Sequence, residues 1–464
     1  MIVVDAIAVA AVTYIGKEYL AKKKQSRKAP PGLMDTAYSG GELSSPAVYK
    51  NKISEKGKKA VHHFQDLTAK TGWEETDNAI IVNSFDEWSP LKEVVIGSPI
   101  NYELPGLELS FKLFFHDVAY SSFCYPTYEK ATAESAIAQK NDSEQKDLDR
   151  GRQKRYVEEL TEDVEELADT LRKLGIKVHR PMPLDRAIHF KTPYWEATGL
   201  PALNVRDQAI IIGNEIIETS PQVRARYFEN DLLKPVFYEY FKAGSGWMTM
   251  PKPIMSDRSF DTSYVSGEST PAIQKVYSQQ SSEFDVGFEM MIDAAQCIRF
   301  GKDILVNVAS ENHELGLKWL QYYLGGKFRF HRLYRFADNH IDSLVLPLRP
   351  GTLLVRNPGI VDKLPKALQK WDKIYAPEPK ERIFPAYEDD DLILTSKFID
   401  LNVLSIDEET VIVNSLFPEL IDTLEKNGFT AIPVRHRHRR LFGGGFHCFT
   451  LDTVREGSLE DYFS

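Results

Sequence analysis

Residues 443–450 read Gly443-Gly444-Gly445-Phe446-His447-Cys448-Phe449-Thr450, and the rest of the chain can be organised around this stretch. Three successive glycines remove side chains from the backbone just before a lone cysteine. Glycine tolerates unusual backbone angles and lets the backbone approach a ligand closely. A cysteine in such a loop could attack a flat electrophile while nearby N–H groups face the developing charge. A buried cysteine behind a flexible turn is the alternative, because free cysteines are usually small core residues.

The composition of the 464-residue chain is ordinary for a soluble enzyme, with 42% hydrophobic residues. That is enough for one large domain or two. The net charge of -10 argues against nucleic acid as the main partner. The three cysteines, Cys124, Cys297 and Cys448, are too few for a disulfide framework and suit a reducing, intracellular compartment. No pair of cysteines has zinc spacing, so we expect no structural metal.

Short runs of aliphatic residues recur along the chain, each ended by Gly, Asn or a turn. They are Leu91–Gly97, Ala209–Gly213, Ile304–Val308, Thr352–Asn357 and Val411–Asn414. Helical patterns lie between several of them, at Tyr156–Leu174, Glu314–Tyr323 and Pro418–Asn427. Strands that alternate with helices predict an α/β fold. About five similar units at irregular spacing also fit a propeller-like repeat, and periodicity alone does not choose between the two.

Residues 1–30 combine an apolar run, residues 2–16, with a basic run that follows it. The apolar run is too short to span a bilayer comfortably, and a secretory signal would carry its positive charge before the run. We therefore expect a helix that lies on an anionic membrane. A short signal-anchor and a helix docked on the protein's own surface are the alternatives. Residues 31–77 look like a linker with a peripheral helix, and residues 78–464 form the predicted globular body.

Four separated sites carry side chains whose chemistry fits together. They are Asp207 before an apolar strand, Asp293 in a Met-Ile-Asp-Ala-Ala run, the pair His340 and Asp342, and Cys448 after the glycines. Residues two apart on a strand share a face, which would bring His340 and Asp342 together. A planar guanidinium with several N–H donors is bound well by paired carboxylates, which Asp207 and Asp342 could supply. The constellation therefore predicts attack on a guanidinium carbon.

In this hypothesis the thiolate of Cys448 attacks, and His340 protonates the leaving amine and later deprotonates the incoming nucleophile. Asp293 could orient His340 and favour its charged form. Each residue also has a simpler interpretation. Asp207 could be a turn residue, Asp293 a helix N-terminal residue, and His340 a polar side chain with ordinary partners. We assign no role to His447, because neighbours on a strand point to opposite faces.

The chain resembles the glycine amidinotransferase family, which moves the amidino group of arginine to an amine. The resemblance runs from about residue 79 to the C-terminus, and several of its stretches are long and ungapped. They are Ser84–Gly97 (SFDEWSPLKEVVIG), Lys191–Pro193, Glu196–Leu200, Arg206-Asp207, Gly213–Glu218, Arg224–Glu229, Pro251–Pro253, Asp293–Ala295, His340–Asp342, Ser396-Lys397, Asn402–Leu404 and Gly443–Thr450.

This resemblance implies an α/β fold of five pseudosymmetric ββαβ units, a pentein-like propeller with an N-terminal helical extension and the active site in its central channel. It implies that Cys448 is the nucleophile and carries a covalent amidino intermediate. It implies that His340 is the general acid and base, with Asp293 as its partner. The residues that it implies for binding the guanidinium and lining the site are Asp207, Asp342 and Ser396. No cofactor and no metal are implied.

Two stretches depart from the family pattern where the far end of a substrate would lie. Residues 357–361 read Asn-Pro-Gly-Ile-Val, whereas the family has an Asn-Pro-Asp-Arg-like turn whose arginine binds the donor's carboxylate. Arg356 is near that place but out of register, and we take it as a candidate substrate-binding residue. Residues 336–339, Phe-Ala-Asp-Asn, replace a Pro-Asn-Pro-Met-like run. With Ala337 and Ile360 there, we predict an apolar rim on which glycine is a poor acceptor.

A basic run, Arg435-His436-Arg437-His438-Arg439-Arg440, leads into the glycine loop. It fits a solvated loop. It also fits an anion site that would compensate for the changed turn by binding a substrate carboxylate.

The sequence therefore predicts an amidinotransferase with a two-step, ping-pong mechanism, whose substrates are L-arginine or a related guanidine and an amine. One alternative is a guanidine hydrolase of the same superfamily, similar to arginine deiminases and dihydrolases, in which water replaces the amine. The other is a membrane-tethered binding protein without activity. The expected partners are small molecules rather than nucleic acid, with a membrane surface for residues 1–30. A homodimer is one option for the assembly.

Overall fold

The computed structural model describes residues 80–116, 142–265, 285–379 and 393–464. The expected N-terminal segment, linker and Cys124 lie outside these ranges. Within the described ranges, no helix is long and apolar enough to cross a membrane. In the same residues no group of His, Cys, Asp or Glu side chains is arranged to hold a metal ion.

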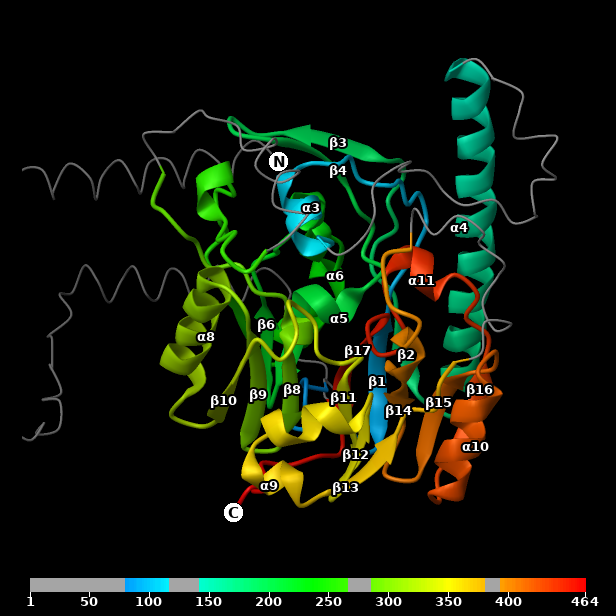
Figure 1. The fold of residues 1–464 in the computed structure, drawn as a ribbon, viewed down its shortest axis with the longest axis vertical. Coiled ribbons are helices and arrows are strands. Elements are labelled where there is room, and N and C mark those ends of the chain that lie inside the picture. Colours follow the sequence, from blue (N-terminus) through cyan, green and yellow to red (C-terminus); the bar gives the residue numbers. More distant parts are fainter. Residues whose placement is uncertain (1–79, 117–141, 266–284, 380–392) are drawn as a thin grey trace, which may run out of the picture. The chain divides into compact units, whose positions relative to one another are not determined.

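Five three-stranded sheets of one design make up most of the described strands (Figure 1). In each sheet the central strand pairs antiparallel with one neighbour and parallel with the other. The sheets, with the central strand second, are β17 (Thr450–Arg455), β1 (Leu91–Ile96) and β2 (Lys177–His179); β5 (Ala209–Ile212), β6 (Glu215–Glu218) and β7 (Gly246–Thr249); β8 (Cys297–Phe300), β9 (Asp303–Val308) and β10 (Arg329–Tyr334); β11 (Val345–Arg349), β12 (Thr352–Val355) and β13 (Asp372–Tyr375); and β14 (Leu404–Ser405), β15 (Thr410–Asn414) and β16 (Thr430–Val434).

Each parallel pair is joined by a segment that contains a helix, as a crossover between parallel strands requires. These helices are α4 (Asp142–Lys173), α6 (Lys234–Lys242), α8 (Glu311–Leu324), α9 (Lys366–Gln369) and α10 (Pro418–Lys426). Four sheets therefore follow the order strand, strand, helix, strand along the chain. In the remaining sheet the C-terminal strand β17 takes the first place beside β1. Cys448, two residues before β17, is thereby brought to the sheet that begins the described body.

The other elements lie between these units and position the site. They are α3 (Leu109–Phe114), α5 (Val205–Gln208), α11 (Arg439–Phe442), the hairpin β3 (Ile188–Lys191) and β4 (Glu196–Gly199), and the 3-10 turns η2 (Arg224–Arg226), η3 (Glu229–Leu232), η4 (Asp257–Ser259), η5 (Ala294–Gln296), η6 (Pro358–Lys363) and η9 (Ile399–Leu401).

The five aliphatic runs of the sequence all form strands, and the predicted α/β alternation is confirmed. Four of them are the central strands β1, β9, β12 and β15. The exception is Ala209–Gly213, which forms the outer strand β5, while the central strand of that sheet is β6. The aliphatic pattern does not mark β6 because this strand reads Glu-Ile-Ile-Glu, with only two apolar residues between charges. Central strands stand out in sequence because both of their faces are buried.

Helix α8 shows how the helices are attached to the sheets. Ser310 caps its N-terminus by accepting a hydrogen bond from the His313 N–H. Leu317, Leu320 and Leu324 belong to the same buried cluster as the β9 residues Ile304, Val306 and Val308. Burying one such aliphatic side chain contributes roughly 1.5–3 kcal/mol, so this interface holds α8 on β9.

The segment that precedes β1 runs across three of the sheets. Its backbone hydrogen bonds, of 2.8–2.9 Å, join Asn83 to Thr453 in β17, Ser84 to Gly213 after β5, and Phe85 to Gly301 after β8. Glu87 follows this segment and is buried. The fold therefore places one carboxylate at the junction of three sheets, close to the C-terminal strand.

Candidate active site

Cys448 lies in a turn between α11 and β17 and is held by neighbouring segments. Helix α11 ends at Gly443, whose φ of 74° lies in the left-handed region that favours glycine. Gly445 packs so closely that an added Cβ would lie 2.6 Å from the Cβ of Asn402. The Cys448 N–H donates to Asn402 Oδ1 at 2.8 Å, and the Cys448 carbonyl accepts from the Arg206 N–H at 3.1 Å. The glycines thus permit the tight packing that fixes the position of the thiol.

His340 and Asp293 form a hydrogen-bonded pair, with 2.9 Å between His340 Nε2 and Asp293 Oδ2. Asp293 also precedes the turn η5, and its N–H donates to Gln296 Oε1 at 3.1 Å, so both interpretations of this residue apply. Gln208 donates to its other oxygen at 2.9 Å. Burial opposes a charged imidazole, but the charge of Asp207 and the bond to Asp293 raise the pKa of His340 to about 9. His340 is therefore an imidazolium at neutral pH and can donate a proton.

Asp207 keeps one carboxylate oxygen without a hydrogen-bond donor. Its Oδ2 accepts from Arg226 Nη1 at 2.7 Å, and Arg226 is fixed in turn by Glu229. Its Oδ1 is buried and accepts no hydrogen bond within the described chain, and His340 Nδ1 lies 3.9 Å from it. Burial raises the pKa of Asp207, although the positive charges of His340 and Arg226 act to lower it. Because an unsatisfied buried carboxylate oxygen is costly, this atom is suited to a ligand that brings N–H groups.

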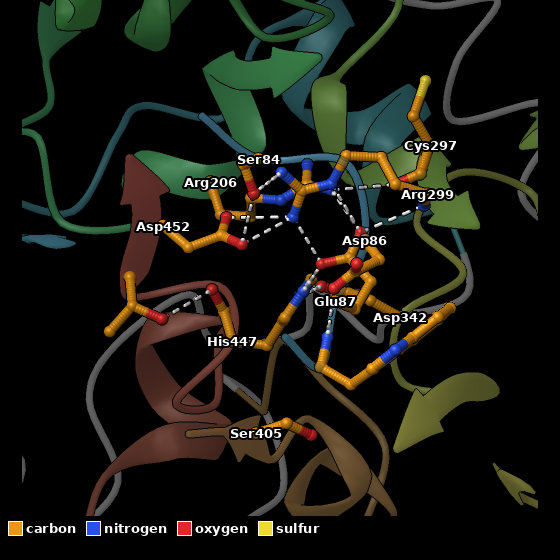
Figure 2. A network of polar contacts seen from close by, with 12 residues as sticks. Ser84, Asp86, Glu87, Arg206, Cys297, Arg299, Asp342, Ser405, His447 and Asp452 are labelled. Carbon is orange, nitrogen blue, oxygen red and sulfur yellow. Dashed lines mark hydrogen bonds and ion pairs between the residues drawn. The ribbon is translucent and has the colours of Figure 1, made fainter. Parts of the chain in front are cut away.

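Asp342 connects Cys448 to His447. The Cys448 thiol donates to Asp342 Oδ2 at 3.4 Å, and the same oxygen is 2.8 Å from His447 Nδ1. The other ring nitrogen of His447 faces Glu87 Oε2 at 3.2 Å (Figure 2). Burial and the negative charges of Asp342 and Asp207 raise the pKa of Cys448 well above its ordinary value. The resting thiol is therefore neutral until a positive charge enters the site.

The reason for which His447 was assigned no role was wrong. It assumed that residues 447 and 448 lie on a strand, where neighbours point to opposite faces. Residues 446–449 instead form a turn, and β17 begins only at Thr450. In this turn both side chains contact the same oxygen of Asp342.

The predicted site residues gather around one hollow. A cavity of about 360 Å³ and a smaller one of about 50 Å³ share His340 in their walls. Asp293 lies behind His340 and lines neither cavity. The other predicted residues are divided between the two, with Asp207 at the smaller cavity and Asp342, Arg356, Ser396 and Cys448 at the larger one.

The rim of the larger cavity differs in part from the prediction. Ala337 lines it, but Ile360 does not. Ile360 belongs to the 3-10 turn η6 and packs on a core cluster that includes Leu364. The prediction for Ile360 was wrong because the chain turns into η6 directly after Asn357. Arg356 instead lines the cavity, with its guanidinium 4.6 Å from the centre of the Phe398 ring and no ion pair to any described residue.

The basic run before the glycine loop serves neither of its predicted purposes, because it is used inside the protein. Arg435 and Arg437 both contact Asp163 of α4, at 2.8 and 3.0 Å. His438 Nε2 lies 2.6 Å from Glu159, also on α4. A buried pair joins Arg439 to Asp400 at 2.7 Å. The run therefore fastens α4 and η9 beside the glycine loop.

Comparison with known proteins identifies the family. No family model matches the chain. L-arginine:L-lysine amidinotransferase from Pseudomonas savastanoi pv. phaseolicola is 33% identical over 384 residues, which cover 82% of this chain and 96% of that protein. The chain belongs to the amidinotransferase family. Mitochondrial glycine amidinotransferase from Xenopus tropicalis is 32% identical over 388 residues, covering 82% of this amidinotransferase and 85% of its relative.

A solved structure agrees with this assignment. Inosamine-phosphate amidinotransferase StrB1 from Streptomyces griseus matches with a TM-score of 0.65 and 31% identity, over 82% of this amidinotransferase and 99% of that chain. The resemblance inferred from sequence is thus confirmed. The amines in the names of these relatives are lysine, glycine and inosamine phosphate. Since the identities are nearly equal, they do not select an acceptor for this amidinotransferase.

Sequence reasoning missed several residues that hold the site. They are Glu87, Arg226, Asn402 and His447. All four are buried, and all but Asn402 are charged or titratable. A signal was present for two of them. Glu87 lies between the aromatic residues Phe85 and Trp88, and Arg226 lies in an Arg-Ala-Arg run beside aromatic residues. Because charged residues are rarely buried unless they are paired, such positions indicate an internal partner.

Proposed function

We propose that this amidinotransferase moves the amidino group of L-arginine to an amine through a covalent intermediate on Cys448. The observation that carries the proposal is the convergence of the Cys448 thiol, the His340–Asp293 pair and the unpaired Asp207 oxygen on one hollow. A guanidinium could donate N–H groups to Asp207 and Asp342 while it exposes its carbon to the sulfur.

In the first half-reaction the sulfur attacks the guanidinium carbon. A C–S bond forms, and the C–N bond to the side-chain nitrogen of arginine breaks. The leaving nitrogen takes a proton from the His340 imidazolium, so ornithine departs as a neutral amine. Overall the thiol loses one proton and the leaving nitrogen gains one. Because His340 supplies the proton that the leaving nitrogen gains and ends neutral, the proton of the thiol is released to solvent.

The substrate's own charge is expected to activate the thiol. In the resting site the negative charges of Asp342 and Asp207 hold the pKa of Cys448 high. A guanidinium between these carboxylates offsets their field and stabilises the thiolate. The nucleophile is thus formed only when a donor is bound, which limits reaction of the cysteine with other electrophiles.

In the second half-reaction an amine takes the place of ornithine. His340, now neutral, removes one proton as the amine nitrogen attacks the amidino carbon, and the C–S bond breaks. His340 is thereby restored to the imidazolium, the thiolate takes back one proton from solvent, and the guanidino product leaves. If water attacked instead, the products would be urea and free enzyme, and the protein would be a hydrolase.

The proposal is tested by incubating the full chain with arginine alone and measuring its intact mass. We expect an amidino adduct that maps to Cys448 and is absent from Cys448→Ser. Adding amines one at a time should discharge the adduct to a guanidino product. Since the structure places Arg356 rather than Ile360 at the cavity, our reason for disfavouring glycine no longer holds, and glycine belongs in this panel. Absence of an adduct, or release of urea unaffected by every amine, would contradict the proposal.

Arg356 is proposed to bind the carboxylate of arginine. It lines the cavity as a cation without an ion pair to a described residue. Replacing Arg356 by alanine should raise the KM for arginine about tenfold, since a charge-assisted hydrogen bond contributes roughly 1.5–3 kcal/mol and part of this is screened by solvent. Agmatine, which lacks the carboxylate, is the matched control and should be affected little. An equal loss for both donors would show that Arg356 does not read the carboxylate.

We also propose two features of the whole chain. The first is that the five units close into a fivefold pseudosymmetric ring, an arrangement supported by the common strand order of the sheets. The second is that residues 1–30 bind an anionic membrane surface in a reducing, intracellular compartment. The apolar run followed by basic residues supports this, and so do the free thiols of Cys297 and Cys448.

Deleting residues 1–30 should release the protein from vesicles that contain phosphatidylserine, with arginine turnover unchanged. The physical reason is the loss of both the apolar face and the basic charges that anionic lipid attracts. Co-sedimentation measures the effect, with vesicles of neutral lipid as the control. Equal binding of the full-length and truncated chains would contradict the proposal.

A further inference from the structure

A buried network of charged side chains connects His447 through Glu87 to Arg299 and Asp452 (Figure 2). Glu87 faces His447 on one side and Arg299 on the other, with 2.6 Å between Glu87 Oε2 and Arg299 Nη2. Arg299 also contacts both oxygens of Asp452, at 2.8 and 2.9 Å. Arg206 approaches the other Glu87 oxygen at 3.4 Å. All of these side chains are buried.

Geometry sets the charge of His447. Both of its ring nitrogens face carboxylate oxygens, Nδ1 towards Asp342 at 2.8 Å and Nε2 towards Glu87 at 3.2 Å. A neutral imidazole has one N–H and one lone pair, so one nitrogen would direct its lone pair at a negative oxygen. Only the imidazolium can donate to both. The other charged or titratable groups around His447 are Cys448, which is adjacent in sequence, and Arg206 and Arg299, which contact Glu87.

We propose that His447 is a positioning residue for amidino transfer, a permanently charged imidazolium that ties Asp342 to Glu87 and fixes Asp342 beside the Cys448 thiol. This inference rests on the proposed function, since it assigns Asp342 to the guanidinium. The pKa of His447 is raised, because its bonds to Asp342 and Glu87 outweigh the effect of burial. Conversely, burial alone would raise the pKa of Asp342, but the bond to His447 and its charge lower it.

Glu87 is the anchor that keeps His447 in place. Arg299 donates to both of its oxygens from its Nε, its Nη2 and its backbone N–H. Burial favours the protonated acid, but Arg299, the bond to His447 and Arg206 lower the pKa of Glu87 well below its ordinary value. Because three sheets meet at the segment before Glu87, the position of this carboxylate is set by the fold. The fold is therefore coupled to Asp342 through one imidazolium.

The site thus contains two histidine–carboxylate pairs with different duties. His340 has a cavity wall on one side and passes its proton to and from substrate. His447 is enclosed between two carboxylates and keeps its proton throughout the cycle. Its positive charge also lies one residue from the sulfur, where it reduces the repulsion between Asp342 and the thiolate.

The charge of His447 can be measured without relying on turnover. In the Cys448→Ser protein with ¹⁵N-labelled histidine, both ring nitrogens of His447 should give imidazolium NMR shifts that do not change between about pH 6 and 8. The resonances are assigned by their absence from His447→Gln, or from His447→Asn if the first variant does not fold. A neutral tautomer anywhere in this pH range would overturn the proposal, whether or not the chain proves to transfer amidino groups.

The effect on Asp342 is measured by arginine binding in the same Cys448→Ser background. With His447 present, the Kd for arginine should vary little over this range. In His447→Gln the pKa of Asp342 rises, so the carboxylate is protonated as the pH falls, and the Kd should increase about tenfold for each pH unit below that raised pKa. Asp207 is present in both proteins and cancels from the comparison. A folded His447→Gln variant with an unchanged pH profile would overturn the proposal.

His436 provides the matched control. It is a buried histidine near the same loop, and its Nε2 lies 3.0 Å from the carbonyl oxygen of Gly444 rather than from a carboxylate. Burial and the charge of Arg439 lower its pKa to about 4, so it is neutral. His436→Gln should disturb packing as His447→Gln does. The Kd for arginine should nevertheless vary with pH as little as it does when both histidines are present. A similar change of profile in both variants would mean that loop packing, and not the imidazolium, sets it.

Discussion

Replacing Cys448 by alanine should abolish the transfer of amidino groups while arginine still binds. The Cys448 thiol lines the cavity and donates to Asp342, a carboxylate proposed to bind the guanidinium, so it is the group that we propose carries the intermediate. Asp207 and Asp342 remain in the variant, and they are the groups proposed to hold the cation. Turnover is measured as ornithine release, and binding by titration calorimetry.

Cys297 is the matched control for this substitution. It is a buried free thiol on β8, and burial raises its pKa to about 12. It belongs to a core cluster that also contains residues of β5, β6 and β9, and it lines neither active-site cavity. Cys297→Ala should therefore cost about 1 kcal/mol of stability and leave turnover in place. Measurable turnover in Cys448→Ala would refute the nucleophile assignment, and loss of arginine binding would mean that the substitution damages the site itself.

The fold could be predicted from the sequence to the level of its repeated units but not to the way in which these units connect. Aliphatic runs mark β1, β9, β12 and β15 because central strands are buried on both faces. The strand β6 was missed because its short apolar core is flanked by glutamates. The pairing of β17 with β1 could not be derived from local pattern, since it joins residues far apart in sequence. The family resemblance implied five pseudosymmetric units but did not specify this pairing.

The sequence proposed Asp293 and His340 together because a histidine base is commonly oriented by a carboxylate, and the structure places the two in contact, while their catalytic roles stay a prediction. Sequence reasoning failed where the position of a side chain depends on the course of the backbone. His447 was misjudged because a strand was assumed where the chain makes a turn. The rim was misjudged at Ile360 because η6 redirects the chain into the core. The basic run was misjudged because its partners, such as Asp163, lie some 270 residues earlier in the chain.

His340→Asn and Asp293→Asn should each lower turnover by about 10²- to 10⁴-fold, the usual value of general acid–base catalysis. His340→Asn removes the group that we propose protonates the leaving nitrogen. Asp293→Asn keeps a similar shape but removes the negative charge that favours the imidazolium. The pair His331 and Asp303, 2.6 Å apart on β10 and β9, is the matched control. It lines neither active-site cavity, so His331→Asn should leave turnover in place.

The pH dependence separates these two losses. The first half-reaction needs the imidazolium, so at saturating arginine its single-turnover rate should fall as the pH rises through the pKa of His340 in the complex. Asp293 raises that pKa through its hydrogen bond and its charge, and in the free protein His340 reaches about 9. In Asp293→Asn the pKa falls, so the loss of rate should begin at lower pH than in the wild type. His340→Asn has no imidazole to titrate and should lose this limb altogether. If Asp293→Asn is slow at every pH but keeps the wild-type limb, Asp293 orients the ring without supporting its charge.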